Sequence, residues 1–296
     1  MSLTTTNPPL LAHTQIITAS CPSQSGTVDV ITRYLNEQGF YINEIHSFDD
    51  HDKSRFFIRI EFRPATDQGF NRNSFVSGFK DRAARFDLQW QLFAKTYKPR
   101  VVIMVSRHDH CLNDLLYRYR TGDLEIEIPA IISNHPDLED LAKWHGIRFY
   151  YLPISKDSKP QQEEMVWDII QQSDTDLVVL ARYMQVLSND LCRKLSGRAI
   201  NIHHSLLPGF KGAKPYHQAY DKGVKLVGAT AHFVSDDLDE GPIITQGVET
   251  VDHSYYPQDL AATGRDVECL TLARAVRYFI ERRIFLNGDK TVIFPN

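Results

Sequence analysis

Three side chains that can catalyse acyl transfer lie near the ends of two predicted strands. Asn201 and His203 are two residues apart in a segment that continues an apolar strand and ends at Pro208. Alternate strand residues point to the same side, so both can face one space while Ile202 packs inward. An amide donor beside an imidazole suits the oxyanion of acyl transfer. Asp239, in an acidic turn after a second strand, completes a candidate acid–base site that needs neither a metal nor a covalent nucleophile.

Several of these residues also have a structural interpretation. Asn201 is a residue type that stabilises turns at strand ends. His204 points away from His203 if the strand continues, which favours a structural role. His232, on the strand before the acidic turn, either orients the catalytic acid or its water, or packs. We expect His110 at the surface. The histidines show no HxxxH or HExxH spacing, so we expect no metal site.

Composition limits the remaining classes of function. A chain of 296 residues favours two domains, and 42% hydrophobic with 24% charged residues is typical of a soluble globular protein. The net charge of -4 predicts no nucleic-acid partner. No apolar stretch approaches a membrane helix, and residues 1–9 lack the pattern of a signal peptide. We therefore expect no membrane association, a cytoplasmic location and reduced cysteines, which are Cys21, Cys111, Cys192 and Cys269.

The catalytic segment belongs to the second of two predicted α/β domains. In the first, residues 1–95, strands are predicted at 15–20, 41–46, 55–62 and 88–92, with helices near 28–35 and 72–85. This βαββαβ order is the ferredoxin-like pattern.

In the second domain, residues 99–296, short apolar strands alternate with helices. Strands are predicted at 101–105, 126–132, 148–152, 177–180 and 199–202, then at 227–234 and 243–248, with helices near 111–119, 138–145, 161–172, 188–195 and 258–283. This order predicts a doubly wound, mostly parallel sheet, which binds ligands beyond the carboxyl ends of its strands. Asn201 and His203 lie at such an end.

Three motifs carry a resemblance to a known family. Residues 201–208, 232–242 and 180–188 resemble, in this order and at similar spacing, the formyltransferase family that uses 10-formyltetrahydrofolate. The resemblance implies that Asn201 donates to the oxyanion, that His203 stabilises it and protonates the departing nitrogen, and that Asp239 holds His203 and accepts a proton from water. It places a folate pocket, formed partly by backbone groups, at Met184, Val186, Leu187, His232, Val234 and Ser235. No cofactor is expected, because the folate is the substrate.

The first domain is similar to ACT-type regulatory domains. ACT-type domains commonly pair edge to edge and bind small amino-acid effectors at the turn between the first strand and helix, here residues 21–26. We therefore expect a homo-oligomer and consider an amino-acid effector. Residues 264–268 and 287–294 resemble the ending of the family's hydrolytic members, which implies hydrolysis of 10-formyltetrahydrofolate to tetrahydrofolate and formate, within one-carbon and purine metabolism.

Two alternatives stay open. The first is a formyltransferase with an amine acceptor, although the turn at residues 106–111 lacks the glycines that hold a substrate phosphate in transferase relatives. Arg107 in this turn is a candidate anion ligand or a solvated side chain. The second alternative is a folate or amino-acid sensor with no catalysis, which would not require Asn201, His203 and Asp239 together.

Overall fold

The chain divides into two compact units. A computed structural model describes residues 12–66, 69–155, 157–209 and 215–295, and residues 1–9, where no signal peptide is expected, lie outside them. Residues 1–97, 281–285 and 294–296 form the first unit, while residues 98–280 and 286–293 form the second. Within the described ranges, no helix is both long and apolar enough to cross a membrane.

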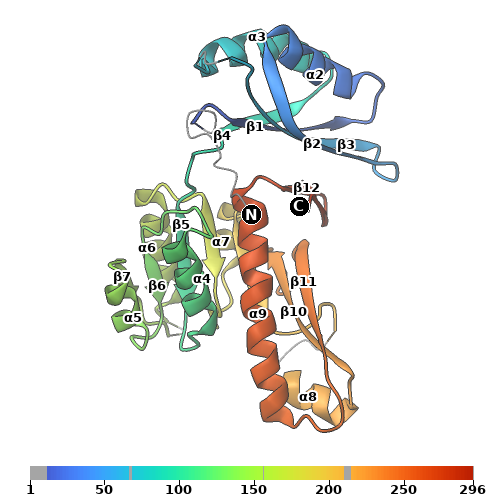
Figure 1. Ribbon diagram of the computed structural model, residues 1–296. Coiled ribbons are helices and arrows are strands. Elements are labelled where there is room, and N and C mark those ends of the chain that lie inside the picture. The colour runs from blue at the N-terminus through green and yellow to red at the C-terminus, as the bar shows by residue number, and fades with distance from the viewer. Residues whose placement is uncertain (1–11, 67–68, 156, 210–214, 296) are drawn as a thin grey trace, which may run out of the picture. The chain divides into compact units, whose positions relative to one another are not determined.

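The first unit is a ferredoxin-like sheet with two helices (Figure 1). Its strands are β1 (Gln15–Pro22), β2 (Phe40–Asp50), β3 (Arg55–Pro64) and β4 (Gln89–Ala94), and its helices are α2 (Thr27–Glu37) and α3 (Arg72–Ala84). The sheet is antiparallel in the order β2-β3-β1-β4. Helix α3 begins where the Asn71 side chain accepts a hydrogen bond from the Ser74 backbone N–H. Both helices pack on one face of the sheet through buried residues such as Ile60, Phe62 and Phe79.

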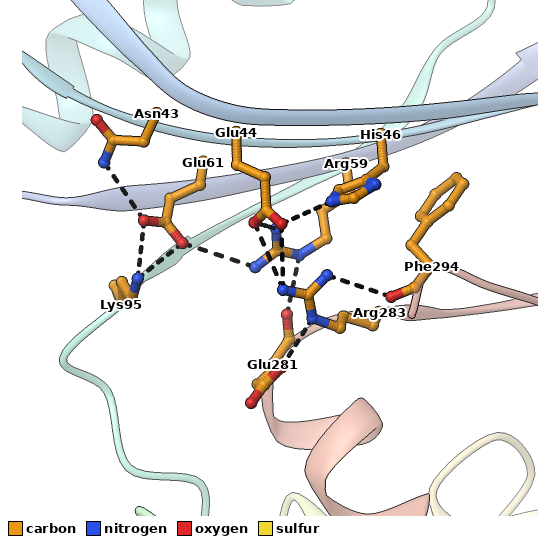
Figure 2. Close-up of polar contacts among 9 residues, drawn as sticks. All are labelled: Asn43, Glu44, His46, Arg59, Glu61, Lys95, Glu281, Arg283 and Phe294. Carbon is orange, nitrogen blue, oxygen red and sulfur yellow. Dashed lines mark hydrogen bonds and ion pairs between the residues drawn. The ribbon is translucent and has the colours of Figure 1, made fainter. Parts of the chain in front are cut away.

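The other face of this sheet carries charged side chains that bind the returning C-terminal segment (Figure 2). Arg59 on β3 is 2% exposed and donates to the Glu44 carboxylate at 2.6 Å and to the Glu281 backbone carbonyl at 3.0 Å. Arg283 also reaches Glu44, at 3.3 Å, and donates to the Phe294 carbonyl. The buried guanidinium groups therefore obtain their partners from segments far apart in sequence, as buried charges require.

The second unit is a seven-stranded sheet in the order β11-β10-β9-β8-β5-β6-β7. The parallel strands are β5 (Val101–Val105), β6 (Ile131–Ser133), β7 (Phe149–Tyr151), β8 (Leu177–Leu180) and β9 (Ala199–His203), and β10 (Leu226–Phe233) runs antiparallel between β9 and β11 (Ile243–Thr250). All residues of β5 and β8 are buried, as in central strands of parallel sheets. The predicted doubly wound, mostly parallel fold is confirmed.

Helices cover this sheet (Figure 1). They are α4 (His110–Thr121), α5 (Glu139–Trp144), α6 (Lys159–Gln172), α7 (Asn189–Lys194), α8 (Pro215–Lys222) and α9 (Pro257–Ile280). Helix α9 packs along β9, β10 and β11 and beside α4. The chain ends in strands β12 (Ile284–Asn287) and β13 (Lys290–Ile293), which form a separate two-stranded sheet.

The strand predicted at residues 126–132 is much shorter in the structure. The apolar run 126–132 enters the sheet only from Ile131, and the preceding residues form a single bridge between Glu127 and Arg100. Pro129 lies within this run and has no N–H to donate to a neighbouring strand. The ladder therefore starts after the proline.

Candidate active site

Strands β9 and β10 bring the first candidate residues together. Their antiparallel register places Asn201 opposite His232 and His203 opposite Thr230. Residues on one face of paired strands are close enough to interact. The Asn201 Nδ2 atom accordingly lies 3.1 Å from the His232 Nε2 atom. Asn201 is partly buried, and His203 is 6% exposed.

The loop after β10 brings Asp239 over the end of β9. The loop closes on itself, because the Phe233 N–H donates to the Pro242 carbonyl at 2.9 Å. Gly241 makes this return possible, since a Cβ there would lie 1.7 Å from the Phe233 carbonyl oxygen. Asp239 adopts a left-handed φ of 59°. The result is a distance of 3.2 Å between Asp239 Oδ2 and His203 Nδ1.

Asp239 is an ionised partner that fixes the orientation of the His203 imidazole. A hydrogen bond with His203, together with the histidine's charge, lowers the pKa of Asp239 from its usual value despite burial. With Nδ1 of His203 directed at the carboxylate, the other ring nitrogen is left free. Nε2 of His203 is buried and has no hydrogen-bond partner among the described residues. Such an atom is positioned to act on a bound substrate.

His232 orients the Asn201 amide. Its Nδ1 atom lies 2.9 Å from the Phe233 carbonyl oxygen, which can only accept, so Nδ1 carries the proton. Nε2 of the neutral ring then accepts from Asn201 Nδ2. Burial lowers the pKa of His232, which keeps the ring neutral at pH 7. The second N–H of Asn201 remains available to an oxyanion.

A cavity of about 280 Å³ unites the predicted site. Every residue predicted for catalysis or folate binding lines it, namely Asn201, His203, Asp239, Met184, Val186, Leu187, His232, Val234 and Ser235. Met184 and Val186 are about half exposed, whereas Leu187 is buried. The wall is therefore apolar on the side of residues 184–187 and polar beside His203, as expected for a ligand site with a few placed polar groups.

Ser106 and Ser188, neither of them a predicted site residue, hold the loop at residues 181–188 by hydrogen bonds. The Ser106 hydroxyl accepts from the Met184 backbone N–H at 3.0 Å and donates to Asn134 Oδ1 at 2.6 Å. At the loop's end, the Ser188 side chain caps helix α7 by accepting from the Leu191 N–H. The position of Ser106 directly after the first strand of the parallel sheet is the only sequence signal for this role.

A buried carboxylate adjoins the cavity. Glu268 on helix α9 is 1% exposed and lies 2.7 Å from His110 Nε2, 2.8 Å from the Tyr216 hydroxyl and 3.4 Å from Arg182 Nε. Burial would raise the pKa of Glu268, but the hydrogen bond from His110 and the charge of Arg182 lower it overall. The prediction that His110 lies at the surface is wrong, because its side chain is only 15% exposed and binds this carboxylate.

His204 lies beside His203 and not opposite to it. Strand β9 ends at His203, so the alternation of the strand does not reach the next residue. The two imidazole rings are 5.2 Å apart, and His204 also lines the cavity. Burial, followed by the charges of Arg182 and His203, lowers the pKa of His204 to about 4. His204 is therefore neutral at pH 7.

One group of side chains has the spacing of metal ligands. In the described part of the chain, ligand atoms of His110, Cys111 and Glu268 lie within 4.8 Å of one another. His110 and Glu268 already bind each other, and a hydrogen bond with Cys269 together with burial raises the pKa of the Cys111 thiol. Two of these three groups are therefore already paired with each other within the protein.

Comparisons with known proteins found similarity in both sequence and structure. The sequence profile of the family described as Formyl transferase matches residues 99–276. A formyltetrahydrofolate deformylase from Corynebacterium sp. (strain P-1) is 50% identical, over 94% of this chain and 97% of the relative. The crystal structure of a formyltetrahydrofolate deformylase from Pseudomonas putida KT2440 is 60% identical with a TM-score of 0.90, over 95% of this chain and all of that one. A second one, from Burkholderia mallei ATCC 23344, is 54% identical with a TM-score of 0.92, over 96% and 100% of the two chains.

Proposed function

This chain belongs to the formyltetrahydrofolate deformylase family and hydrolyses 10-formyltetrahydrofolate to tetrahydrofolate and formate, and we propose that Asn201, His203 and Asp239 carry out the reaction. One observation supports these roles above all others. The His203 imidazole lines a cavity of about 280 Å³ and is held through Nδ1 by Asp239, while its buried Nε2 atom has no hydrogen-bond partner among the described residues.

The pterin of the substrate binds at the apolar wall of the cavity. The backbone of residues 184–187 offers hydrogen bonds, and the Ser106 hydroxyl keeps Met184 in place. Val234 and Ser235 also line the cavity. With the ring held there, the formyl group reaches the polar end of the cavity, where Asn201 and His203 lie.

Water attacks the formyl carbon, and negative charge develops on the formyl oxygen. The free N–H of Asn201 and the imidazolium of His203 donate to this oxygen, and removal of one such donor typically costs about 100- to 1000-fold in rate. Asp239 Oδ2 holds His203, which leaves Oδ1 to accept a proton from the attacking water. This oxygen lies 3.7 Å from the unprotonated Nε2 of His232, a distance without a hydrogen bond.

The second half of the reaction breaks the bond between the formyl carbon and the folate nitrogen. His203 gives its Nε2 proton to the departing nitrogen, so tetrahydrofolate leaves as a neutral amine, and the formic acid formed with it loses its hydroxyl proton to solvent and leaves as formate. Proton exchange with solvent returns Asp239 to the carboxylate and His203 to the imidazolium. The proposal needs no metal and no cofactor.

An acceptor-free assay tests this function. The protein is mixed with 10-formyltetrahydrofolate and no amine, and formate and tetrahydrofolate are measured. Stoichiometric release of both supports hydrolysis. If formate appeared only as a formyl group on an added amine, the protein would be a transferase. Binding of the folate without turnover would identify a sensor.

The first unit has a proposed role in assembly and regulation. Strand β2 is a sheet edge of 11 residues, with Tyr41, Ile45 and Phe48 exposed, and an unpaired edge of this kind can pair with a second copy. We therefore propose a homo-oligomer joined through β2. A small amino acid is the proposed effector, at the turn before helix α2. The four unpaired cysteines favour a reducing compartment, which supports the cytoplasm as the proposed location.

A further inference from the structure

Arg182 provides a fixed positive charge at the wall of the cavity. It is the only lysine or arginine among the described residues that line this space. The residue is 9% exposed and lies directly after strand β8. Its backbone has a left-handed φ of 64°, which is uncommon for a side chain of this size. A conformation of this kind is retained where the surrounding structure requires it, so the position of Arg182 is built into the fold.

The guanidinium of Arg182 is not fully satisfied by the protein. Its Nε atom is buried and has no hydrogen-bond partner among the described residues. The nearest carboxylate oxygen, Oε2 of Glu268, is 3.4 Å away and forms an ion pair without a hydrogen bond. A buried donor without a partner is costly unless something else binds it.

Each oxygen of the Glu268 carboxylate already accepts one hydrogen bond, and neither forms one with Arg182 Nε. Oε2 lies 2.7 Å from the His110 Nε2 atom, and Oε1 accepts a hydrogen bond from the Tyr216 hydroxyl at 2.8 Å. The carboxylate therefore holds Arg182 in place electrostatically while its hydrogen bonds go elsewhere. Arg182 remains a cation with at least one free donor.

A second free donor lies on the same cavity. Among the described residues, Nε2 of His203 is the other buried nitrogen of the lining without a hydrogen-bond partner, and the neighbouring His204 ring is neutral. The acidic residues of the lining do not occupy these donors, since Asp239 binds Nδ1 of His203 and Asp236 lies 3.4 Å from Arg193. Two nitrogen donors, one of them permanently cationic, suit a small carboxylate.

We propose that Arg182, together with His203 once its Nε2 atom is protonated again, forms the binding subsite for the formate anion released by hydrolysis. The inference rests on the proposed function, because formate is the carboxylate that this reaction generates in the cavity. As the bond to the folate nitrogen breaks, the new carboxylate gains a negative charge next to the guanidinium. Formate thereby pairs with Arg182 and is separated from the tetrahydrofolate nitrogen, which disfavours the reverse reaction.

Product inhibition by formate tests the subsite. Initial rates with 10-formyltetrahydrofolate are measured against sodium formate, with sodium chloride keeping the ionic strength constant. We expect the inhibition constant for formate to rise about tenfold or more in Arg182→Gln, since a hydrogen bond to a charged group is lost. Arg182→Lys keeps the positive charge but lacks the planar guanidinium, and we expect a smaller rise in the inhibition constant for formate. Arg274→Gln is the matched control, because Arg274 is exposed on helix α9 and outside the cavity lining, and its inhibition constant should equal that of the wild type.

A second variant covers the case in which Arg182→Gln does not fold. The double variant Arg182→Gln/Glu268→Gln removes both charges and leaves no buried carboxylate without its cation. Binding of ¹³C-formate, followed by the NMR line width of the formate carbon, is then compared between this variant, Arg182→Lys and the wild type. Weaker binding in the folded variants supports the subsite. Inhibition and binding constants within about twofold of the wild type would overturn it, as would a wild-type enzyme that does not bind formate. A wild type that released no formate from the substrate would instead contradict the proposed function.

Discussion

Nδ1 of His203 lies 3.2 Å from Oδ2 of Asp239, although the first residue ends strand β9 and the second follows strand β10. The contact determines which nitrogen of the imidazole faces the substrate. It depends on the closed loop after β10 and on the left-handed backbone of Asp239. The catalytic geometry is therefore a property of the loop as much as of the strands.

Replacement of Asp239 by asparagine should reduce turnover strongly. An asparagine amide can donate to Nδ1 of His203, which would put the proton on the wrong nitrogen, and it can neither stabilise an imidazolium nor accept a proton from water. We expect kcat to fall by about 10²- to 10⁴-fold with an unchanged circular dichroism spectrum. Asp266→Asn, an exposed change on helix α9, is the control and should keep full activity. Near-normal turnover in Asp239→Asn would remove the assigned role.

His232 acts by orienting Asn201, so its replacement should affect kcat more than KM. In His232→Leu the Asn201 amide loses the acceptor at 3.1 Å and its free N–H no longer has a fixed direction. We expect kcat to fall about tenfold with little change in KM, a loss smaller than that of a direct oxyanion donor. His253→Gln, at an exposed position, is the control. If KM rose and kcat stayed constant, His232 would contribute to folate binding and not to the orientation of Asn201.

The sequence predicted the strands and the site where short-range rules govern them. Alternation along β9 brings Asn201 and His203 to one side, whereas the antiparallel register that sets Asn201 opposite His232 on β10 does not follow from alternation alone. The start of β6 could not be placed from apolar content alone, because Pro129 interrupts the hydrogen-bond ladder within an otherwise suitable run.

Contacts between distant segments explain most of what the sequence did not show. Glu268 and His110 are 158 positions apart, and neither lies in a pattern that indicates the other. His110 therefore looked like a surface residue. Arg182 belongs to a recognised segment, but its direction depends on a left-handed backbone that no local pattern indicates for an arginine.

Gly241 should not tolerate a side chain. In Gly241→Ala the new Cβ would lie 1.7 Å from the Phe233 carbonyl oxygen and 3.3 Å from His232 Nδ1. The loop must then open, which separates Asp239 from His203 and disturbs the acceptor of His232. We expect kcat to fall by at least about 100-fold, as for loss of a catalytic group. The control is Gly69→Ala, where the nearest atom would be 3.8 Å away. Equal activities of the two variants would show that the close approach is unimportant.

A charge on the edge strand β2 should weaken the proposed oligomer. Ile45 is 44% exposed on this strand, and a lysine there would place charges against each other across a paired edge. We expect Ile45→Lys to shift the mass measured by light scattering toward the monomer at low micromolar concentration. Tyr117→Lys changes a residue on helix α4 that is 57% exposed and should leave the mass unchanged. A wild-type monomer at all concentrations would contradict the oligomer.

Loss of the Glu44 charge should destabilise the first unit at neutral pH and much less in acid. Burial would raise the pKa of Glu44, but hydrogen bonds from His46 and Arg59, with the charges of Arg59 and Arg283, lower it to about 2 (Figure 2). In the unfolded chain the carboxylate titrates near 4.5, so the unfolded state takes up the proton first as the pH falls. The stabilisation is thus complete above about pH 4.5 and disappears toward pH 2.

Glu44→Gln leaves the buried Arg59 without its nearest carboxylate, and we expect it to lower the free energy of unfolding by about 2 kcal/mol at pH 7. Scanning calorimetry at pH 7, 5, 4 and 3 should show the difference in Tm between variant and wild type narrowing with acidity. Glu37→Gln removes an exposed pair with Arg82 and should change Tm little at any pH. A Tm difference that was the same at every pH would mean that Glu44 stabilises the unit by packing and not by its charge.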